Sequence, residues 1–398
     1  MPARTVIVAG AGIGGLAAAL ALNRAGFRVV ILEQAERLAE TGAGIQLSPN
    51  ATRILIELDL ADRLRPLVVA PEALRVLSAK SARQIVRMPL GAAAEARYGS
   101  PYWVIHRGDL QSALAAAVAQ QRDISLKLNM RVEDFVTHAK GVTVSARNAA
   151  GQWDERGHAL IAADGLWSAA RALIGAQDAP EFSGRTAWRA TIEAAAAPPE
   201  FREPIVYLWL GSDTHLVHYP VKAGALINIV VITTDSWSGP GWSEPASRDE
   251  ILPRLSAANF APAARALVRL PERWLKWALF QRPPLMTWSN GAAALLGDAA
   301  HPMLPFLAQG AAMAIEDAAV VAQCLARMPD DAPRALRTYT AMRRARTRKV
   351  QSEAARNGER YHLSTIPAIV RNLAMRALGG EHLLHRYDWL YDWRPPQA

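Results

Sequence analysis

The feature that most constrains the fold of this chain is a glycine-rich turn close to its amino terminus. Residues 10–15 read GAGIGG, with an apolar β-branched run before them and an apolar, alanine-rich run after them. Strand, turn and helix in this order form the first part of a dinucleotide-binding βαβ unit. Gly10 permits the tight turn, Gly12 lets backbone approach a pyrophosphate, and Gly15 lets the helix pack closely on the strand. Glycines that serve only for packing would give the same sequence pattern, so this interpretation needs support from the rest of the chain.

An acidic residue follows the next strand. A second apolar run, residues 28–32, ends at Glu33. In dinucleotide-binding units an acid at about 20 residues after the turn binds the ribose hydroxyls. Glu33, its neighbour Gln34, and Gly14 of the turn are therefore further candidate cofactor-binding residues.

The composition favours a large globular protein. The chain has 398 residues, 51% of them hydrophobic, which suffices for a large core and two or three lobes. Its formal charge of +9 suits anionic cofactors or acidic aromatic substrates. The arginines are scattered and the 12 tryptophans follow no stacking motif, so we expect no nucleic acid partner. The single Cys324 excludes an internal disulfide and favours a reducing, cytoplasmic location. We expect no metal, and the glycines within the first apolar run argue against a membrane span.

A second constraining stretch is the segment Gly297–Ala319, GDAAHPMLPFLAQGAAMAIEDAA. An apolar run at residues 292–296 predicts a short buried strand, and prolines force a turn over residues 300–309. Gly310 opens an alanine-rich helix whose first amides lack partners within the helix and whose dipole favours negative charge. A proline-rich connection before an ordinary core helix is the simpler interpretation. The candidates from this stretch are Pro305 for a catalytic role and Asp298, Gly310, Ala311 and Ala312 for cofactor binding.

A third pattern, D-G-x-x-S-x-x-R, runs from Asp164 to Arg171. It follows an apolar strand at residues 158–162, so Asp164 again leaves the end of a buried strand. Ser168 and Arg171 are three residues apart and share one face if a helix begins there.

Weaker signals lie between these motifs. The glycine-rich loop at residues 40–50 contains Gly44 and Ile45, whose backbone can lie flat against a ligand, unless the loop is simply flexible. Arg107, at the boundary of a strand and a helix, can clamp a phosphate or can be a surface arginine capped by Asp109. Further strands are expected at residues 74–78, 84–88, 126–132 and 141–146, with a loose Ala/Gly segment after the second of them.

With these residues quoted, the chain resembles the single-component FAD-dependent aromatic hydroxylases, the para-hydroxybenzoate hydroxylase class. Three spaced motifs carry the resemblance: GAGIGG with Glu33, DGLWSAAR, and GDAAHP followed by PFLAQGAAMAIEDA. It covers nearly the whole chain. The chain is most similar to the salicylate, 3-hydroxybenzoate and 6-hydroxynicotinate hydroxylase branch, which the ending HRYDWLY at residues 385–391 also resembles.

The resemblance implies FAD as the cofactor. Glu33 would bind the adenosine ribose, Arg107 the FAD phosphates, Val132 the adenine region through its backbone, and Asp298 the ribityl or ribose-phosphate chain. NADH or NADPH would visit only transiently as electron donor, because no second G-x-G-x-x-G is present.

Two further roles follow from the resemblance. Asp164 and Arg171 would lie in the segment that the class associates with FAD and with the nicotinamide donor. The amides of Ala311 and Ala312 would stabilise negative charge around the flavin N1–C2=O edge.

The expected fold class is α/β. A Rossmann-like FAD-binding domain carries an inserted α+β substrate domain with an antiparallel sheet, and helices end the chain. The FAD-binding domain takes residues 1–74, 101–178 and 285–330; the substrate domain takes residues 75–100 and 179–284; the C-terminal helices take residues 331–398. Strands of the substrate domain are expected near residues 186–192, 204–210, 215–220, 226–233 and 275–280, with a helical insert over residues 248–268.

The candidate catalytic side chains lie on one of these strands. Period-two alternation puts His215 and Tyr219 on one face and His218 on the other. Hydroxylation of a phenol needs an electron-rich ring, and a histidine beside a tyrosine suits removal of the phenolic proton near neutral pH. The pair also matches the His and Tyr four residues apart that line the site in the nicotinate branch. Two polar residues on the wet face of a sheet are the simpler alternative.

Other residues compete for roles in substrate binding. His218 replaces His215 as the base if the strand register slips by one residue. His301 lies in the GDAAHP motif and suits a structural or gating role. Arg189, beside Trp188, could clamp a substrate carboxylate or could form the rim of the core.

The predicted function is that of an FAD-dependent aromatic-ring monooxygenase. NADH or NADPH would reduce FAD, and reduced flavin would capture O2 as a C4a-hydroperoxide that hydroxylates a small phenolic or hydroxypyridine acid. A flavin-dependent reductase of the same fold and a non-catalytic flavin-binding sensor are the alternatives. We expect a monomer or a homodimer.

The C-terminal part is predicted to be helical. Residues 332–358 form a long arginine-rich helix whose basic residues make a solvated face or a dimer contact, and a further helix spans residues 366–378. The buried stripe of the long helix is expected to consist of Leu336, Tyr339, Met342 and Val350. The aromatic ending needs a surface to cover it.

Overall fold

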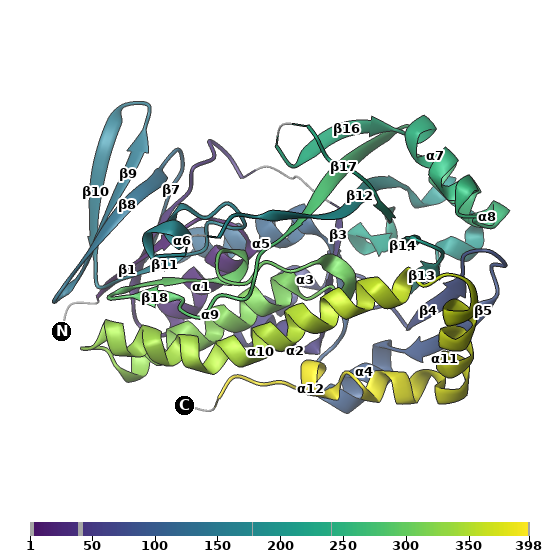
Figure 1. The fold of residues 1–398 in the computed structure, drawn as a ribbon. Helices are drawn as coiled ribbons and strands as arrows, with labels where there is room; N and C mark the ends of the chain where they lie inside the picture. Colours follow the sequence, from purple (N-terminus) through teal and green to yellow (C-terminus); the bar gives the residue numbers. More distant parts are fainter. Residues whose placement is uncertain (1–3, 39–42, 177, 240, 397–398) are drawn as a thin grey trace.

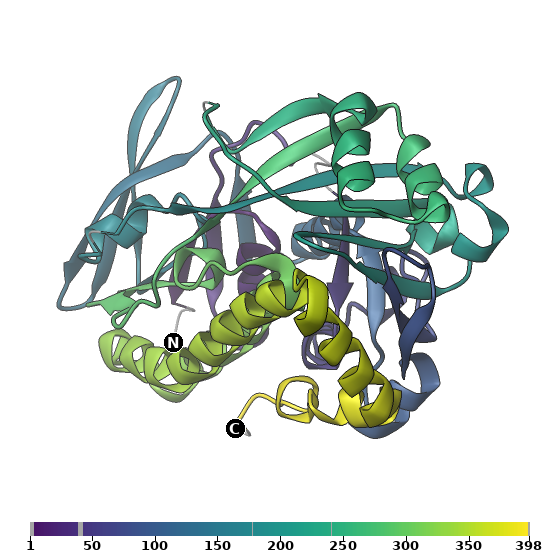
Figure 2. The same ribbon diagram turned by 45° about the vertical axis from the view of Figure 1, so that its right-hand side comes forward.

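The computed structural model describes residues 4–38, 43–176, 178–239 and 241–396. Figure 1 shows a parallel sheet with its helices, an antiparallel sheet with helices α7 and α8 on its outer side, and the long helix α10 running beneath both. Figure 2 shows the same layers from a direction in which α11 descends from the end of α10.

The first layer is a six-stranded sheet in the order β18-β19-β11-β1-β2-β7. All neighbouring strands in it are parallel except β18 and β19. Helices α1, α5 and α9 lie side by side against it, and the antiparallel segment of residues 141–157 contacts β1 and β11, so the central strands are buried on both faces, as near-continuous apolar runs require. The strands are β1 (Thr5–Ala9), β2 (Arg28–Leu32), β7 (Ile124–Lys127), β11 (Ala159–Ala162), β18 (Ser289–Asn290) and β19 (Ala293–Leu295); the helices are α1 (Ile13–Arg24), α5 (Arg107–Ala119) and α9 (Gly310–Arg327).

A three-stranded antiparallel ribbon extends from this layer and stands at the left of Figure 1. Its strands are β8 (Arg131–His138), β9 (Gly141–Asn148) and β10 (Gly151–Gly157). The single strand predicted at residues 126–132 is wrong. The chain turns at Asn129, whose φ of 57° is left-handed, so β7 and β8 belong to different sheets.

The second layer is an eight-stranded sheet in the order β16-β17-β12-β15-β14-β13-β4-β5. It is antiparallel apart from the parallel pairing of β13 with β4. The five strands predicted for residues 179–284 are all present, but β16 was missed and the helical insert consists of two helices, α7 (Arg248–Ala257) and α8 (Pro262–Arg269). The strands are β4 (Ala73–Ser78), β5 (Gln84–Pro89), β12 (Glu181–Glu193), β13 (Ile205–Leu210), β14 (Thr214–Val221), β15 (Leu226–Thr234), β16 (Ser243–Ser247) and β17 (Arg273–Gln281).

The two faces of the eight-stranded sheet have different environments. One face carries Trp188, Leu216 and Ile229, which are fully buried in a core completed by α7 and α8. On the other face, Ala187 and Ile232 form a cluster with Phe306 from the first layer. The sheet therefore packs directly on the turn that precedes α9.

Short elements connect the layers. The segment after β5 was predicted to be loose but is a helix, α4 (Gly91–Tyr98). Its alanines favour the helix, which begins at Gly91 and ends at Gly99 in the left-handed conformation. The other elements are β3 (Gly44–Leu47), β6 (Trp103–His106), α2 (Pro49–Glu57), α3 (Ala61–Leu64), α6 (Ala169–Leu173) and the short 3-10 turns Ala194–Ala196, Pro199–Phe201, Lys222–Gly224, Gly297–Ala299 and Pro305–Leu307.

Three helices end the chain: α10 (Ala332–Tyr361), α11 (Thr365–His385) and α12 (Asp388–Tyr391). Of the stripe predicted for α10, Leu336, Tyr339 and Val350 are buried but Met342 is 38% exposed. The aromatic ending finds its cover within the chain, because the ring of Tyr391 packs edge-on against the rings of Tyr98 and Tyr102.

The prediction that the arginines of α10 are solvated is wrong for Arg343. This side chain is buried, with Nη1 lying 2.6 Å from Glu316 Oε2 and Nε 2.6 Å from Asp317 Oδ1, both on α9. Burial alone would raise the pKa of Asp317, but His301 and Arg343 hold it down to about 2. Charges removed from water persist only when each has its partners, so this cluster joins α9 to α10.

Among the helices of the described residues, none combines the length and the apolar character that a membrane crossing requires.

We predict that Arg343→Met lowers the free energy of unfolding by about 3 kcal/mol, because it leaves two buried carboxylates without their shared cation. Urea unfolding at neutral pH measures the change. Arg356→Met on the same helix is the control, since Arg356 forms an exposed pair with Glu353 and should cost less than about 0.5 kcal/mol. Equal losses for the two variants would contradict this account of the cluster.

Candidate active site

The order of the first sheet brings the sequence motifs together. Strands β19, β11, β1 and β2 are neighbours, and GDAAHP, DGLWSAAR, GAGIGG and Glu33 follow them in that order. Because these strands are parallel, their carboxyl ends meet at one edge of the sheet, where open α/β folds bind ligands.

The glycine-rich turn is built for close approach. A Cβ on Gly15 would lie 1.9 Å from the carbonyl oxygen of Gly10, and a Cβ on Gly10 would lie 2.5 Å from that of Ala163. A Cβ on Gly12 would meet nothing within 4 Å, so that side of the turn is open. Helix α1 begins there without a side-chain cap or an acid in its first turn. The turn thus offers space and a positive helix end to an anionic group.

Glu33 lies against this turn. Its carboxylate accepts hydrogen bonds from the backbone N–H of Ala11 at 2.6 Å and of Ala35 at 2.9 Å. Gln34 beside it is exposed. The carboxylate therefore braces the glycine-rich loop, while Gly14 packs tightly, since a Cβ there would lie 2.9 Å from Leu296 Cδ2.

Asp164 and Arg171 belong to one motif but have different hydrogen-bond partners. Asp164 Oδ1 is buried without a hydrogen-bond partner among the described residues, and burial raises the pKa of this carboxyl. Arg171 is buried and already paired, donating to Asp178 and to the carbonyl oxygens of Ala299 and Ala300. Asp164 is thus open to a ligand, whereas Arg171 holds the loop after β19.

Ser168 and Arg171 do lie together, as their spacing predicted. The Arg171 backbone N–H donates to Ser168 Oγ at 2.9 Å, which caps α6.

Asp298 and Gly310 face each other across the turn before α9. A Cβ on Gly310 would lie 3.9 Å from Asp298 Oδ1. The Asp298 side chain is accessible to water, yet the surrounding protein raises the pKa of the carboxyl by desolvation.

Helix α9 starts at this place without a side-chain cap and without an acid in its first turn. Ala311 is half-buried and Ala312 is buried. Pro305, in the preceding 3-10 turn, is half-buried, and Ala308 adopts a left-handed φ of 52°. A strained backbone next to an open helix end is typical of a functional turn.

Arg107 begins α5, and its charge reaches across the junction of the two layers. Its positive charge opposes the rise in the pKa of Asp298 that burial causes, and it adds to the lowering of the pKa of Arg189, on the eight-stranded sheet, that burial also causes. Asp109 pairs with Lys222 Nζ at 3.0 Å, which leaves the predicted capping of Arg107 by Asp109 without support.

These features fit a dinucleotide such as FAD. The glycine cradle, the unpaired Asp164 oxygen and two uncapped helix ends match an elongated group with phosphates and hydroxyls. Of the other cofactor candidates, Gly44 and Ile45 lie on β3 and Val132 lies at the start of β8, all half-buried. Residues 40–42 of the predicted loop lie outside the described residues.

The face of the eight-stranded sheet that meets the first layer carries His215, Tyr219 and Arg189. Register pairs His215 with Ile232, and Ile232 with Ala187, so His215 belongs to the face that contacts Phe306. The rings of His215 and Phe306 lie 5.6 Å apart. The predicted alternation of this strand is therefore confirmed.

Tyr219 contacts Gly44 on β3, one of the short elements between the two layers. A Cβ on Gly44 would lie 2.5 Å from Tyr219 Cε2, and the Gly44 N–H donates to Asn228 Oδ1 at 2.7 Å. Burial raises the pKa of Tyr219, which also hydrogen-bonds Gln46. The phenol therefore stays protonated at neutral pH.

Arg189 brings an uncommitted charge to the same face. Its Nε is buried without a hydrogen-bond partner among the described residues, and the guanidinium lies 5.5 Å from the ring centre of Trp277. Burial lowers the pKa of Arg189. A half-buried cation with a buried, unpaired nitrogen is suited to an anionic partner.

His218 points to the opposite face. It is fully buried, its ring stacks on that of Tyr207 at 4.5 Å, and neither ring nitrogen has a partner in the described part of the chain. Desolvation lowers its pKa to about 3. His218 therefore lies in the core under α7 and α8 and not beside His215.

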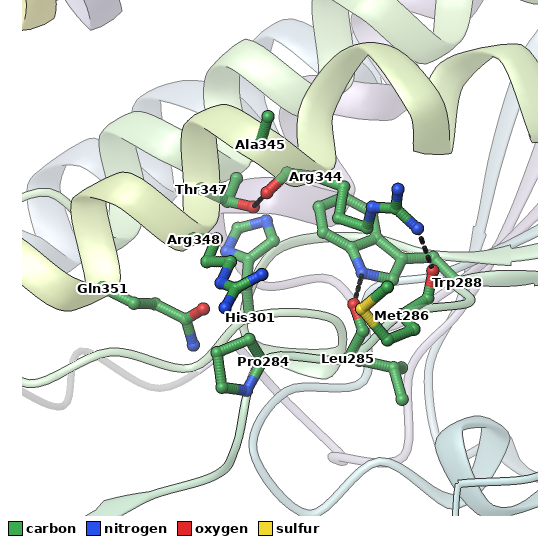
Figure 3. A pocket seen from close by; sticks show the side chains of 10 residues that line it. All are labelled: Pro284, Leu285, Met286, Trp288, His301, Arg344, Ala345, Thr347, Arg348 and Gln351. Atoms are coloured by element: carbon green, nitrogen blue, oxygen red, sulfur yellow. Dashed lines mark hydrogen bonds between the residues drawn. The ribbon is translucent and has the colours of Figure 1, made fainter.

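His301 also faces elsewhere. Its Nε2 lies 2.6 Å from Asp317 Oδ2, and its ring lies 5.1 Å from that of Trp288. Figure 3 shows it lining a cavity of about 250 Å³ with Arg344 and Arg348 from α10. The residues that line this cavity come from the first layer and α10, so His301 suits a structural role.

Three side chains at the site were missed by sequence reasoning: Asn228, Phe306 and His362. His362 Nε2 lies 2.7 Å from His215 Nδ1, although 147 positions separate the two residues. No local pattern marks such a partner, but the alternation of β15 could have placed Asn228 on the face of Ile232.

Comparisons with known proteins agree with this geometry. The chain matches the family described as FAD binding domain over residues 3–354. It is 35% identical over 387 residues to a 3-hydroxybenzoate 6-hydroxylase of Aquipseudomonas alcaligenes, covering 97% of each chain. It is 36% identical over 396 residues to a 3-amino-4-hydroxybenzoate 2-monooxygenase of Streptomyces platensis, covering 97% of this chain and 95% of that one. A salicylate hydroxylase substrate complex is similar in structure, with a TM-score of 0.83 and 27% identity over 98% of this chain and 96% of that chain.

We predict that His218→Phe makes the protein less sensitive to acid. The pKa of His218 is about 3 in the folded state and about 6.5 in the unfolded state, so between these values the unfolded state binds one more proton. Stability is therefore lost as pH falls below about 6.5, and the variant should remove about 1.4 kcal/mol per pH unit of that loss.

Urea unfolding between about pH 6 and pH 4 measures this slope. His138→Phe is the control, because His138 is exposed. An unchanged slope in His218→Phe would contradict a neutral, buried His218.

Proposed function

Since the chain belongs to the FAD-binding-domain family and is, with its relatives, an FAD-dependent aromatic monooxygenase, we propose that it uses NADH or NADPH and O2 to hydroxylate a small phenolic or hydroxypyridine acid. The named relatives act on hydroxybenzoates and an aminohydroxybenzoate, which supports this substrate class.

One observation carries the proposal: a half-buried guanidinium without an acidic partner among the described residues, an imidazole with a lowered pKa and a phenol share the face of the sheet that meets the open end of α9. Arg189, His215 and Tyr219 supply these groups. An acid with a ring hydroxyl presents the matching features, a carboxylate and an ionisable oxygen on a flat apolar body.

The residues of the first layer would hold FAD. Gly10, Gly12 and Gly15 would cradle the pyrophosphate, and the α9 amides of Gly310–Ala312 would face the flavin ring. The other residues proposed to contact the cofactor are Gly14, Glu33, Gln34, Gly44, Ile45, Arg107, Val132, Asp164 and Asp298. When bound, FAD supplies the transfer of electrons from NADH or NADPH and the activation of O2 for insertion into the ring.

Arg189 would pair with the substrate carboxylate. The guanidinium is half-buried and lacks an acidic partner in the described residues, so an incoming carboxylate would pair with it. Trp277, stacked against this guanidinium, would limit its orientation.

His215 and Tyr219 would contact the ring hydroxyl and promote its ionisation. Burial, together with the charge of Arg185, lowers the pKa of His215 well below its usual value, so the imidazole is neutral at physiological pH. Tyr219 remains protonated and can donate a hydrogen bond. Phe306 and Ile232, buried beside His215, would keep water from the reacting carbon.

The direct test is a screen of hydroxybenzoates, aminohydroxybenzoates and hydroxynicotinates with the FAD-loaded protein. We expect at least one acid to stimulate oxidation of NADH or NADPH, with matching O2 consumption and a hydroxylated product. Reduction of the acid without O2 uptake would indicate a reductase. Flavin that stays oxidised with every acid would indicate a sensor.

We predict that Arg189→Gln raises KM for a carboxylate substrate by roughly 10- to 100-fold, because a charge-assisted pair is lost. The kcat should change less, since the carboxylate is remote from the reacting carbon. Steady-state kinetics measure both, and the same phenol without its carboxyl group serves as the control. A fold-decrease in kcat that exceeds the fold-increase in KM would contradict the assigned role.

We predict that Gly310→Val impairs FAD binding or reduction, because branched bulk would obstruct the start of α9 beside Asp298. Gly310→Ala is the matched control, since its Cβ would make only ordinary contacts at 3.9 Å. Flavin absorbance of the purified proteins and anaerobic reduction rates measure the effect. Normal FAD content and normal turnover in Gly310→Val would overturn the placement.

A further inference from the structure

His215 is one of two buried histidines in contact. Its Nδ1 lies 2.7 Å from Nε2 of His362, the residue that ends α10, and the ring centres are 4.9 Å apart. Their exposed fractions are 2% and 6%. The rings of Phe306 and Tyr361 pack around His215. The pair is thus shielded from water and held in one arrangement by aromatic packing.

A third side chain determines where the protons of this pair lie. Nη1 of Arg185, on β12, contacts Nδ1 of His362. A guanidinium can only donate hydrogen bonds, so Nδ1 of His362 must accept. A neutral imidazole has a single N–H, which in His362 is then on Nε2 and is donated to Nδ1 of His215. The proton of a neutral His215 therefore lies on Nε2.

The surroundings keep both imidazoles neutral. Burial is the largest cause that lowers the pKa of each, and the positive charge of Arg185 adds to it in both cases. Arg371 acts on His362 in the same direction. Burial lowers the pKa of Arg185, and the acidic groups nearby, Asp213 and Glu359, oppose that shift. No described carboxylate accepts a hydrogen bond from either imidazole.

We propose that Arg185 and His362 are positioning residues that present His215 to the substrate as an N–H donor rather than as a proton acceptor. This inference rests on the proposed function, in which the ring hydroxyl lies at His215. The substrate loses its phenolic proton to solvent before it reaches the shielded pair, and its oxygen, which keeps the electron pair of the broken O–H bond, accepts the Nε2–H of His215. The ring is thereby held in its electron-rich form.

The opposite arrangement is blocked by Arg185. For His215 to accept a proton on Nε2 it must carry its own hydrogen on Nδ1, and His362 must then carry its hydrogen on Nδ1. That hydrogen would face the guanidinium of Arg185, placing two donors against each other. Removal of Arg185 should therefore allow both tautomers of the histidine pair.

The first test reads the tautomers directly. Nitrogen NMR of the FAD-loaded protein with labelled histidine shows which ring nitrogen carries the proton, and His215→Gln and His362→Gln assign the signals. We expect Nε2–H for both residues in the unmodified protein and a mixture in Arg185→Met. Arg185→Lys keeps a donor and should restore the Nε2–H form.

Arg254→Met is the control for general effects of removing an arginine. Arg254 lies over the ring of Trp188, on the opposite face of the same sheet, and its loss should leave the tautomers unchanged. A proton on Nδ1 of His215, or a tautomer that does not respond to Arg185→Met, would overturn the inference.

The second test measures how Arg185 affects the ionisation of a bound ligand. A nitro-substituted hydroxybenzoate absorbs visible light as its phenolate, so difference spectra over pH give the ionisation constant of the bound molecule. We expect binding to favour the phenolate, and Arg185→Met to reduce that preference about tenfold, one pKa unit. Binding with equal ionisation in both proteins would count against the inference. Failure of the acid to bind to FAD-loaded protein would count against the proposed substrate class instead, and the NMR result would still decide the tautomer.

Discussion

A buried cluster of three charged side chains between α9 and α10 holds together the parts from which the site is built. Arg343 reaches Glu316 and Asp317, and Asp317 also accepts hydrogen bonds from the Gly297 amide at 3.0 Å and from His301. Removing such charges from water is costly unless every partner is present. The cluster therefore makes the strand end, the turn before α9 and the helix α10 one unit.

The position of α10 has consequences at its far end. A Cβ on Gly358 would lie 2.6 Å from Phe306, so the helix passes directly over the turn that faces the eight-stranded sheet. Four residues later His362 reaches His215. The same helix thus braces the cofactor side of the junction through Arg343 and the substrate side through His362.

The two faces of the eight-stranded sheet differ: one forms a packed core, and the other carries the side chains of the proposed site. One face buries Trp188 and Ile229 under two helices, and His218 belongs to this core despite its polar ring. On the other face Arg189 has no acidic partner among the described residues, and His215 contacts His362, which contacts Arg185. A charge partly removed from water without a partner is costly, and the proposed substrate carboxylate would offset that cost at Arg189.

Local patterns in the sequence were sufficient for the glycine-rich turn, the strand that ends at Asp298, the helix that starts at Gly310 and the alternation of His215 and Tyr219, because sterics and side-chain periodicity act over a few residues. They failed at Arg343, since the charges that bury it lie on another helix. The contact of Gly44 with Tyr219 and the pairing of His362 with His215 were decided only by the tertiary structure. Those contacts depend on how two layers and a terminal helix come together, and no short-range rule of the chain encodes that arrangement.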